Sequence, residues 1–191
     1  KENEPPDFET IEKLCSECFM PLSYGGGITK FSQVKKLFRI GVEKIVINTS
    51  LFENSKLVEE VAQVYGSQSI VACIDVYRKN GQFYVKNLLK QTNILLKEQI
   101  KKCEHFGCGE IIIQDTEREG TKSGYDLELF KQASDSASVP VIALGGASDL
   151  ENLDEVIKET NVSAAAAGSI FVYAGRRNAV LISGPEMDFS F

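Results

Sequence analysis

The 191-residue sequence has one histidine, no dense basic cluster and no apolar run near the ~18 residues of a membrane span. We therefore expect no membrane contact. Acidic residues outnumber Lys and Arg by 27 to 21, which argues against nucleic-acid binding. Because His105 is the single histidine, the sequence argues against a Ser-His-Asp triad and against a multi-histidine metal site. We expect His105 on the surface.

The five cysteines indicate neither disulfides nor a metal centre. Their odd number, with no secretion signal at the start of the sequence, predicts reduced thiols in a cytoplasmic protein. Cys15 and Cys18 form a Cys-x-x-Cys within a helical pattern, but no second pair completes a zinc site. Zinc is the less favoured interpretation, and we predict no metal and no cofactor.

Short β-branched runs alternate with amphipathic helical patterns along the whole sequence. This alternation predicts a parallel sheet built from βα units. No Pro/Ser-rich linker divides the chain, so we expect one domain. The expected strands cover residues 22–24, 44–48, 70–76, 110–115, 141–144 and 164–167, and the expected helices include 31–40, 55–65, 94–106 and 150–160.

An internal repeat indicates how many βα units the fold has. Residues 21–27 resemble residues 141–147, and at the same offset 48–50 fall on 168–170. This offset spans four expected βα units, so a doubled repeat predicts a (β/α)₈ barrel, in which residues 1–191 form a single domain holding strands 3 to 8. The other two units would lie before Lys1, and six strands cannot close such a barrel.

Glycine turns follow several expected strands, at the helix starts where backbone N–H groups favour anions. Tight turns need glycine anyway, but the paired arrangement favours two phosphate sites and a substrate phosphorylated at both ends. The polar loop 115–126 lies at the same face. The candidate binding residues are Gly26, Gly27, Asn48 and Thr49 at the first site, and Glu119, Gly120, Gly145, Gly146, Gly168 and Ser169 at the second.

Asp75 ends an apolar run, at the end of a barrel strand where catalytic groups project. A helix cap or a loop salt bridge explains such an aspartate equally well. The repeat places a counterpart across the barrel, before Lys1, so we predict facing carboxylates with one outside the sequence. Lys44 and Glu110 begin strands at the opposite end, where an ion pair could simply stabilise the bottom of the ring.

These motifs resemble those of the cyclase-subunit family of imidazole glycerol phosphate synthase. The resemblance covers nearly the whole chain after residue 7 and is carried by residues 25–28, 47–49, 66–68, 74–75, 120–126 and 145–147. Segments 7–9, 16–22, 171–173 and 176–185 are most similar to one branch of that family. Its members are the glycosyl amidation-associated proteins of surface-polysaccharide biosynthesis.

The resemblance implies a (β/α)₈ TIM barrel of the ribulose-phosphate-binding type. It also implies a glutaminase partner, a class I glutamine amidotransferase, that docks at the bottom and supplies ammonia. Asp75 matches one of two catalytic aspartates, while Lys44 and Glu110 match part of a charged ammonia gate. Residues that match positions around the two phosphate sites are Gly27, Asn48, Thr49, Gly120, Gly146, Gly168 and Ser169.

The sequence departs from the family pattern at Glu117-Arg118-Glu119, where the family has Asp-Arg-Asp, and at Gln114-Asp115, where it has a small polar pair. These changes favour a different substrate. We therefore expect conversion of a sugar N-acetyl group to an acetamidino group. The alternative is the histidine-pathway cyclase, which makes imidazole glycerol phosphate and an aminoimidazole nucleotide. A non-catalytic glutaminase activator and a phosphosugar isomerase stay open.

Overall fold

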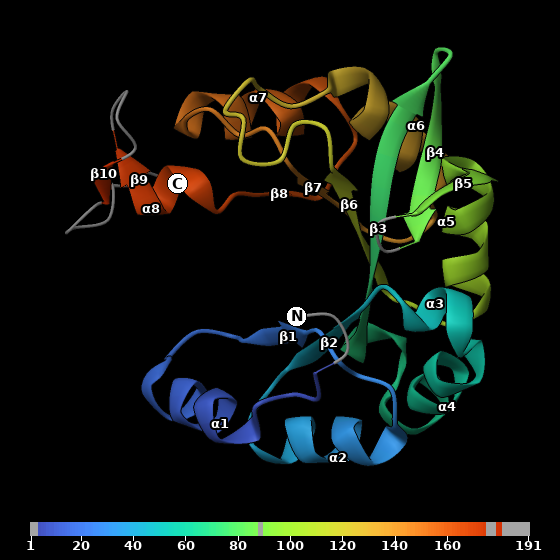
Figure 1. Ribbon diagram of the computed structural model, residues 1–191, viewed down its shortest axis with the longest axis vertical. Coiled ribbons are helices and arrows are strands. Elements are labelled where there is room, and N and C mark those ends of the chain that lie inside the picture. Colours follow the sequence, from blue (N-terminus) through green and yellow to red (C-terminus); the bar gives the residue numbers. More distant parts are fainter. Residues whose placement is uncertain (1–3, 88–89, 175–178, 181–191) are drawn as a thin grey trace.

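Parallel strands form the centre of the molecule and curl into an open arc (Figure 1). The computed structural model describes residues 4–87, 90–174 and 179–180. The strand order confirms the predicted parallel sheet, and its curvature and its alternation with helices are those of a (β/α)₈ barrel. In spatial order the strands are β1 (Ser23–Gly25), β2 (Lys44–Ile47), β3 (Ile70–Lys79), β6 (Glu110–Asp115), β7 (Val141–Leu144) and β8 (Ala164–Ala166).

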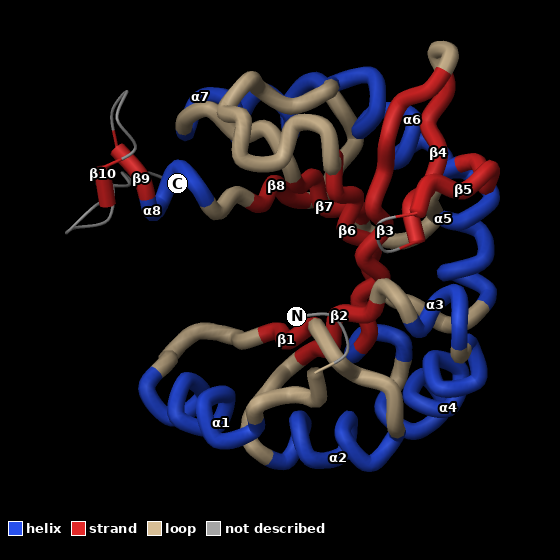
Figure 2. The backbone as a smooth tube through the Cα atoms, viewed as in Figure 1, coloured by secondary structure: helices blue, strands red, loops and turns tan. Residues whose placement is uncertain are grey.

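Helices cover the convex face of this sheet, as Figure 2 shows. The four helices expected from periodicity are present, with ends that differ by at most two residues. In α2, Val34 and Leu37 are fully buried while lysines occupy the outer face. The helices are α1 (Phe8–Glu17), α2 (Phe31–Arg39), α3 (Ser50–Glu53), α4 (Ser55–Tyr65), α5 (Leu96–His105), α6 (Leu127–Ser136), α7 (Leu150–Glu159) and α8 (Ser169–Val172), with a 3₁₀ turn η1 (Ser67–Ser69).

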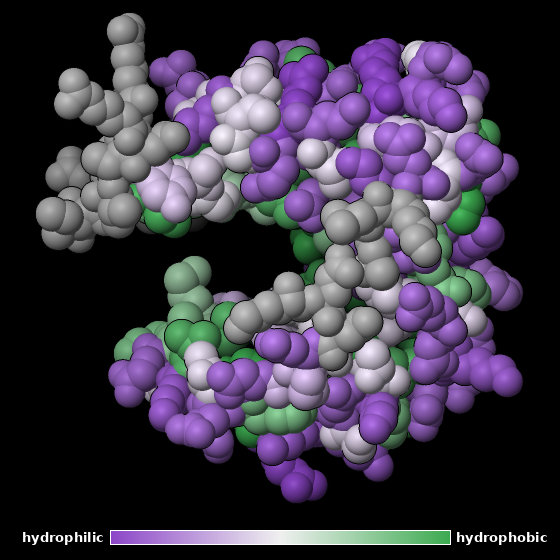
Figure 3. All heavy atoms as spheres, viewed as in Figure 1, coloured by the Kyte–Doolittle hydropathy of each residue, from purple (hydrophilic) through white to green (hydrophobic). Residues whose placement is uncertain are grey.

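The hydrophobic core lies between the sheet and the helices. Along β3 and β6, Ile74 and Ile113 are almost completely buried against the helical layer. The alternate residues, such as Cys73 and Ile112, face the concave side and are partly exposed. Figure 3 shows a deep notch between the two arms of the arc, with hydrophobic residues at its floor.

The arc is open within the described residues, since β1 and β8 each pair with a single neighbouring strand there. Phe19 and Met20, which lie between α1 and β1, are almost fully exposed. No helix in the described ranges is long and apolar enough to cross a lipid bilayer. Because β1 and β8 each have a single paired neighbour in the described residues, two free strand edges bound the inner face of the sheet.

A β-hairpin follows β3 where no strands were expected. Strand β4 (Gln82–Asn87) pairs antiparallel with the end of β3, and β5 (Lys90–Leu95) pairs antiparallel with β4. The turn residues Asn80 and Gly81 have φ of 52° and 77°, the left-handed pair that a two-residue hairpin requires. A short further hairpin joins β9 (Tyr173–Ala174) to β10 (Ala179–Val180).

We expect Gly109→Ala to destabilise the protein by about 1–3 kcal/mol, because an added Cβ would lie 2.4 Å from the Ser67 carbonyl oxygen. Urea unfolding followed by circular dichroism measures the change. Gly168→Ala is the matched control, since a Cβ there meets no atom within 4 Å. Equal stability of the two variants would contradict the close packing of β6 against η1.

Candidate functional site

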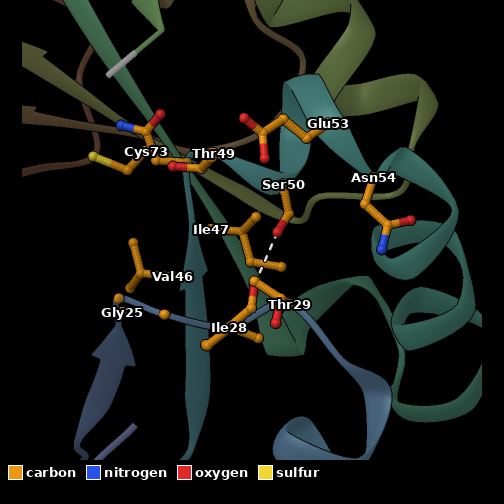
Figure 4. Close-up of a pocket in the computed structure, with 13 residues that line it drawn as sticks. Gly25, Ile28, Thr29, Val46, Ile47, Thr49, Ser50, Glu53, Asn54 and Cys73 are labelled. Carbon is orange, nitrogen blue, oxygen red and sulfur yellow. Dashed lines mark hydrogen bonds between the residues drawn. The ribbon is translucent and has the colours of Figure 1, made fainter. Parts of the chain in front are cut away.

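A cavity of about 590 Å³ opens at the carboxyl ends of β1 and β2, beside the middle of β3 (Figure 4). The Ser50 hydroxyl donates a 2.8 Å hydrogen bond to the Ile28 carbonyl and so joins the loops that follow β1 and β2. The structure therefore brings the whole first predicted cluster into one wall. The lining includes Gly26, Gly27, Asn48, Thr49 and Cys73.

Close packing contributes to the glycine requirement of this wall. Gly27 has a φ of +65°, and an added Cβ would overlap the carbonyl oxygen of Glu4. At Gly26, with a φ of +117°, the nearest atom to such a Cβ is the Tyr24 hydroxyl at 3.9 Å. At both positions the backbone conformation is one that residues with a side chain rarely adopt, but Gly26 also leaves open space beside the cavity.

The second predicted cluster also assembles, in a shallow pocket at the ends of β7 and β8. This pocket is far smaller than the first cavity. It lies on the opposite arm of the arc (Figure 1). All six predicted residues line it, namely Glu119, Gly120, Gly145, Gly146, Gly168 and Ser169.

Asp75 lies on β3 at the middle of the arc, between the two clusters. Burial raises the pKa of its carboxyl group, while a hydrogen bond from Asn48 and the positive charge of Lys86 act to lower it. The neighbouring Cys73 thiol is more deeply buried, and burial together with the Asp75 charge raises its pKa to about 12. Asp75 is thus held in a polar but poorly hydrated position.

Asn48 connects the first cluster to Asp75. While its side chain interacts with Asp75, its Oδ1 atom is buried with no hydrogen-bond partner among the described residues. A buried amide oxygen is costly without a donor. This acceptor therefore favours a ligand with an N–H or O–H group next to Asp75.

The opposite end of the strands carries an ion pair. The ammonium group of Lys44 on β2 donates to Glu110 Oε1 on β6 at 2.5 Å, and each side chain is about a quarter exposed. Lys44 also borders a second cavity, of about 420 Å³, together with Phe38 and Tyr65. The two predicted gate residues therefore meet beneath β3.

The loop that follows β6 is internally braced. Asp115 Oδ1 accepts hydrogen bonds from the backbone N–H groups of Glu117 and Arg118, and Arg118 Nη1 donates to the Gly124 carbonyl at 3.1 Å. Glu117 Oε2 accepts a 2.9 Å hydrogen bond from the Arg78 backbone. Glu117 and Arg118 thus have contacts within the protein, whereas Glu119 lines the second predicted cluster.

Lys86 is a residue of this site that the sequence patterns did not reveal. It lies on the unexpected hairpin, and its ammonium group donates a 2.6 Å hydrogen bond to Thr116 Oγ1. The Asn80-Gly81 dipeptide was the available sequence signal for the hairpin.

His105 is exposed at the end of α5, as expected, and no cluster suited to a metal ion occurs among the described residues.

Residues 1–177 match the family described as “Histidine biosynthesis protein”. The chain belongs to this family. A “Putative imidazole glycerol phosphate synthase subunit HisF” of Leptospira interrogans is 38% identical, covering 98% of this chain and 76% of the relative. The corresponding subunit hisF2 of Pseudomonas aeruginosa is 37% identical, with 97% and 75% covered. “Imidazole glycerol phosphate synthase subunit HisF” of Bacillus cereus strain G9842 is 40% identical, with 86% and 67% covered.

In this chain we expect the Lys44–Glu110 pair to show a coupling energy of about 1–2 kcal/mol, because partial burial weakens solvent screening. A double-mutant cycle with Lys44→Met and Glu110→Gln, read by urea unfolding, measures it. The exposed Glu9–Lys13 pair of α1 is the control, with an expected coupling of about 0.3–0.5 kcal/mol. Equal couplings would show that Lys44 and Glu110 are fully hydrated.

Proposed function

We propose that this chain is an ammonia-using cyclase subunit of the imidazole glycerol phosphate synthase type. The observation that carries the proposal is the placement of Asp75 between two glycine-lined clusters on opposite arms of one arc. Backbone N–H groups at such turns bind phosphate. A substrate phosphorylated at both ends would span the arc and hold its central atoms over Asp75.

Ammonia would enter at the opposite end of the strands. There the Lys44–Glu110 pair closes the bottom of the sheet, and a glutaminase partner would dock beside its adjoining cavity. The concave face between this pair and Asp75 presents Val46 and Ile112, which are apolar. An apolar path disfavours protonation, so ammonia would arrive as a nucleophile.

The chemistry we propose at the top is addition of ammonia to an imine-type or acyl carbon. A carbon–nitrogen bond forms from the nitrogen lone pair while the π bond of the C=N or C=O group breaks and its electron pair moves to the heteroatom, and the Asp75 carboxylate accepts a proton from the now positively charged nitrogen. Asn48 Oδ1, the buried acceptor without a donor, would receive another N–H of the same nitrogen. A second acid–base group is needed to give a proton to the heteroatom that received the electron pair, so that it can later depart from the carbon.

We propose that two further βα units, outside these 191 residues, close the barrel and supply that second carboxylate. The free edges of β1 and β8 support this proposal, since a closed barrel has no unpaired edge. The length of the relatives also supports it, because the chain spans about three quarters of the Leptospira and Pseudomonas proteins. In the complete barrel, the second carboxylate would face Asp75.

The acceptor molecule that fits this geometry best is the bisphosphorylated intermediate of histidine biosynthesis. Two phosphate clusters on opposite arms match a molecule with a phosphate at each end, whereas a nucleotide sugar carries its phosphates side by side. Similarity of the segments 7–9, 16–22 and 171–173 to glycosyl amidation-associated proteins favours a second candidate, amidation of a glycan sugar. The similar segment 176–185 lies almost entirely outside the described residues.

To separate these functions, the complete protein is given ammonium chloride and either the bisphosphorylated intermediate or a nucleotide-activated N-acetyl sugar. Formation of imidazole glycerol phosphate supports the cyclase, and an acetamidino sugar supports glycan amidation. If neither product forms but a co-purified glutaminase is activated by the protein, the chain is a non-catalytic activator and the proposal is wrong.

We expect Asp75→Asn to lower ammonia-dependent turnover by about 10²–10⁴-fold, because the amide cannot accept the proton. Product formation with saturating ammonium chloride measures the loss. Asp154→Asn is the control, an exposed aspartate on α7, and should retain full activity. Both variants should keep the native circular dichroism spectrum, and full activity of a folded Asp75→Asn protein would remove Asp75 from the mechanism.

A further inference from the structure

The hairpin β4–β5 approaches Asp75 from the edge of β3 that faces away from β6. Val76, the next residue along β3, pairs with Asp115 of β6 and with Val85 of β4. A strand residue has one neighbour on each edge, so β4 and β6 lie on opposite sides of β3 at this level. Continuing the antiparallel register by one step sets Lys86 opposite Asp75.

The Lys86 side chain then crosses β3. Its ammonium group donates to Thr116 Oγ1 at 2.6 Å, although Thr116 follows β6 on the far edge. Cross-strand partners project on the same face of a sheet, so this crossing passes over the face that carries Asp75. Thr116 is itself fixed, because its hydroxyl donates to the Val76 carbonyl at 2.8 Å. The ammonium position is therefore set by the backbone of β3.

Lys86 has no carboxylate within 4 Å in the described part of the chain. Its other close contact is the Tyr77 ring, whose centroid is 5.9 Å from the ammonium nitrogen. The cation is partly buried and is held by a neutral hydroxyl. Its charge is therefore not neutralised by an ion pair of its own.

The remaining groups that face Asp75 are neutral. On its own strand this is the Cys73 thiol, whose pKa is raised far above 7. The loop that follows neighbouring β2 presents the Asn48 amide, and β6 presents Gln114 in register with Asp75. The Lys44–Glu110 pair lies at the other end of these strands. Lys86 is thus the cation that acts on Asp75 among the described residues.

We propose that Lys86, carried on the β4–β5 hairpin and anchored on Thr116, is a positioning residue that keeps Asp75 ionised as the base of the ammonia-dependent reaction. This proposal rests on the proposed function for the identity of the reaction. It does not need that function for the interaction between the two side chains. The hairpin then extends the sheet and also supplies the positive charge that acts on Asp75.

The sign of the effect follows from the causes acting on Asp75. Burial raises the pKa of its carboxyl group, and the Asn48 hydrogen bond and the Lys86 charge oppose that rise. Removing the Lys86 charge therefore raises the pKa further, so the carboxyl group stays protonated to higher pH. A base must be ionised, so the acid limb of the kcat/KM profile moves to higher pH. On that limb kcat/KM falls about tenfold for every pH unit by which the limb moves.

We would test this first without substrate, by carbon-13 NMR titration of the Asp75 carboxyl carbon in the complete protein. The signal is assigned by its loss in Asp75→Asn. Lys86→Met should raise the titration midpoint, Lys86→Gln should do the same, and Lys86→Arg should restore the wild-type value. Lys79→Met is the matched control, since Lys79 is exposed at the end of β3, beside the turn into β4, and should leave the midpoint unchanged.

The second measurement is the pH dependence of kcat/KM with the bisphosphorylated intermediate and ammonium chloride. Lys86→Met should move the acid limb upward and retain most of the activity at high pH, whereas general damage to the site would lower the whole profile. An unchanged Asp75 midpoint in folded Lys86→Met and Lys86→Gln proteins would overturn the Lys86 proposal. A raised midpoint in a protein that turns over neither candidate substrate would leave the side-chain interaction intact and refute the proposed function alone.

Discussion

The hydrogen-bonded pairing of β3 is the constraint on which the whole arrangement depends. This strand pairs with β2 and β6 in parallel and, beyond them, with β4 in the opposite direction. Its amino end supports the Lys44–Glu110 pair and its middle carries Asp75, because the strand continues to Lys79, beyond the end at residue 76 that the sequence predicted. Both glycine-lined clusters and the hairpin take their positions from this strand. A change in its register would therefore displace every candidate functional group together.

Much of the fold could be predicted because βα units are encoded locally. Apolar spacing located α2 and α4 almost to the residue, and β-branched runs located the parallel strands. The two glycine clusters were also predictable, since the carboxyl ends of parallel strands meet at one edge of the sheet. The ion pair of Lys44 with Glu110 followed from the same rule, applied to the amino ends.

The remaining features depend on geometry that spacing alone does not determine. The hairpin interrupts the βα alternation, and its Asn80-Gly81 turn is a local signal that competes with that longer pattern. Lys86 reaches Thr116 only through the combined registers of β4 and β6 on β3. In the loop after β6, Arg118 looks suited to contact substrate but instead bonds to the Gly124 carbonyl, a contact set by the loop's own fold.

The free edges of the arc have a consequence for the chain in isolation. Among the described residues no strand pairs with the outer edges of β1 and β8, and an unpaired strand edge is a template onto which an extended peptide can add as a new strand. Phe19 and Met20 place apolar surface next to the first of these edges. Expressed alone, these 191 residues are therefore expected to self-associate edge to edge, and added strands that satisfy both edges would act as an intramolecular chaperone for the rest of the sheet.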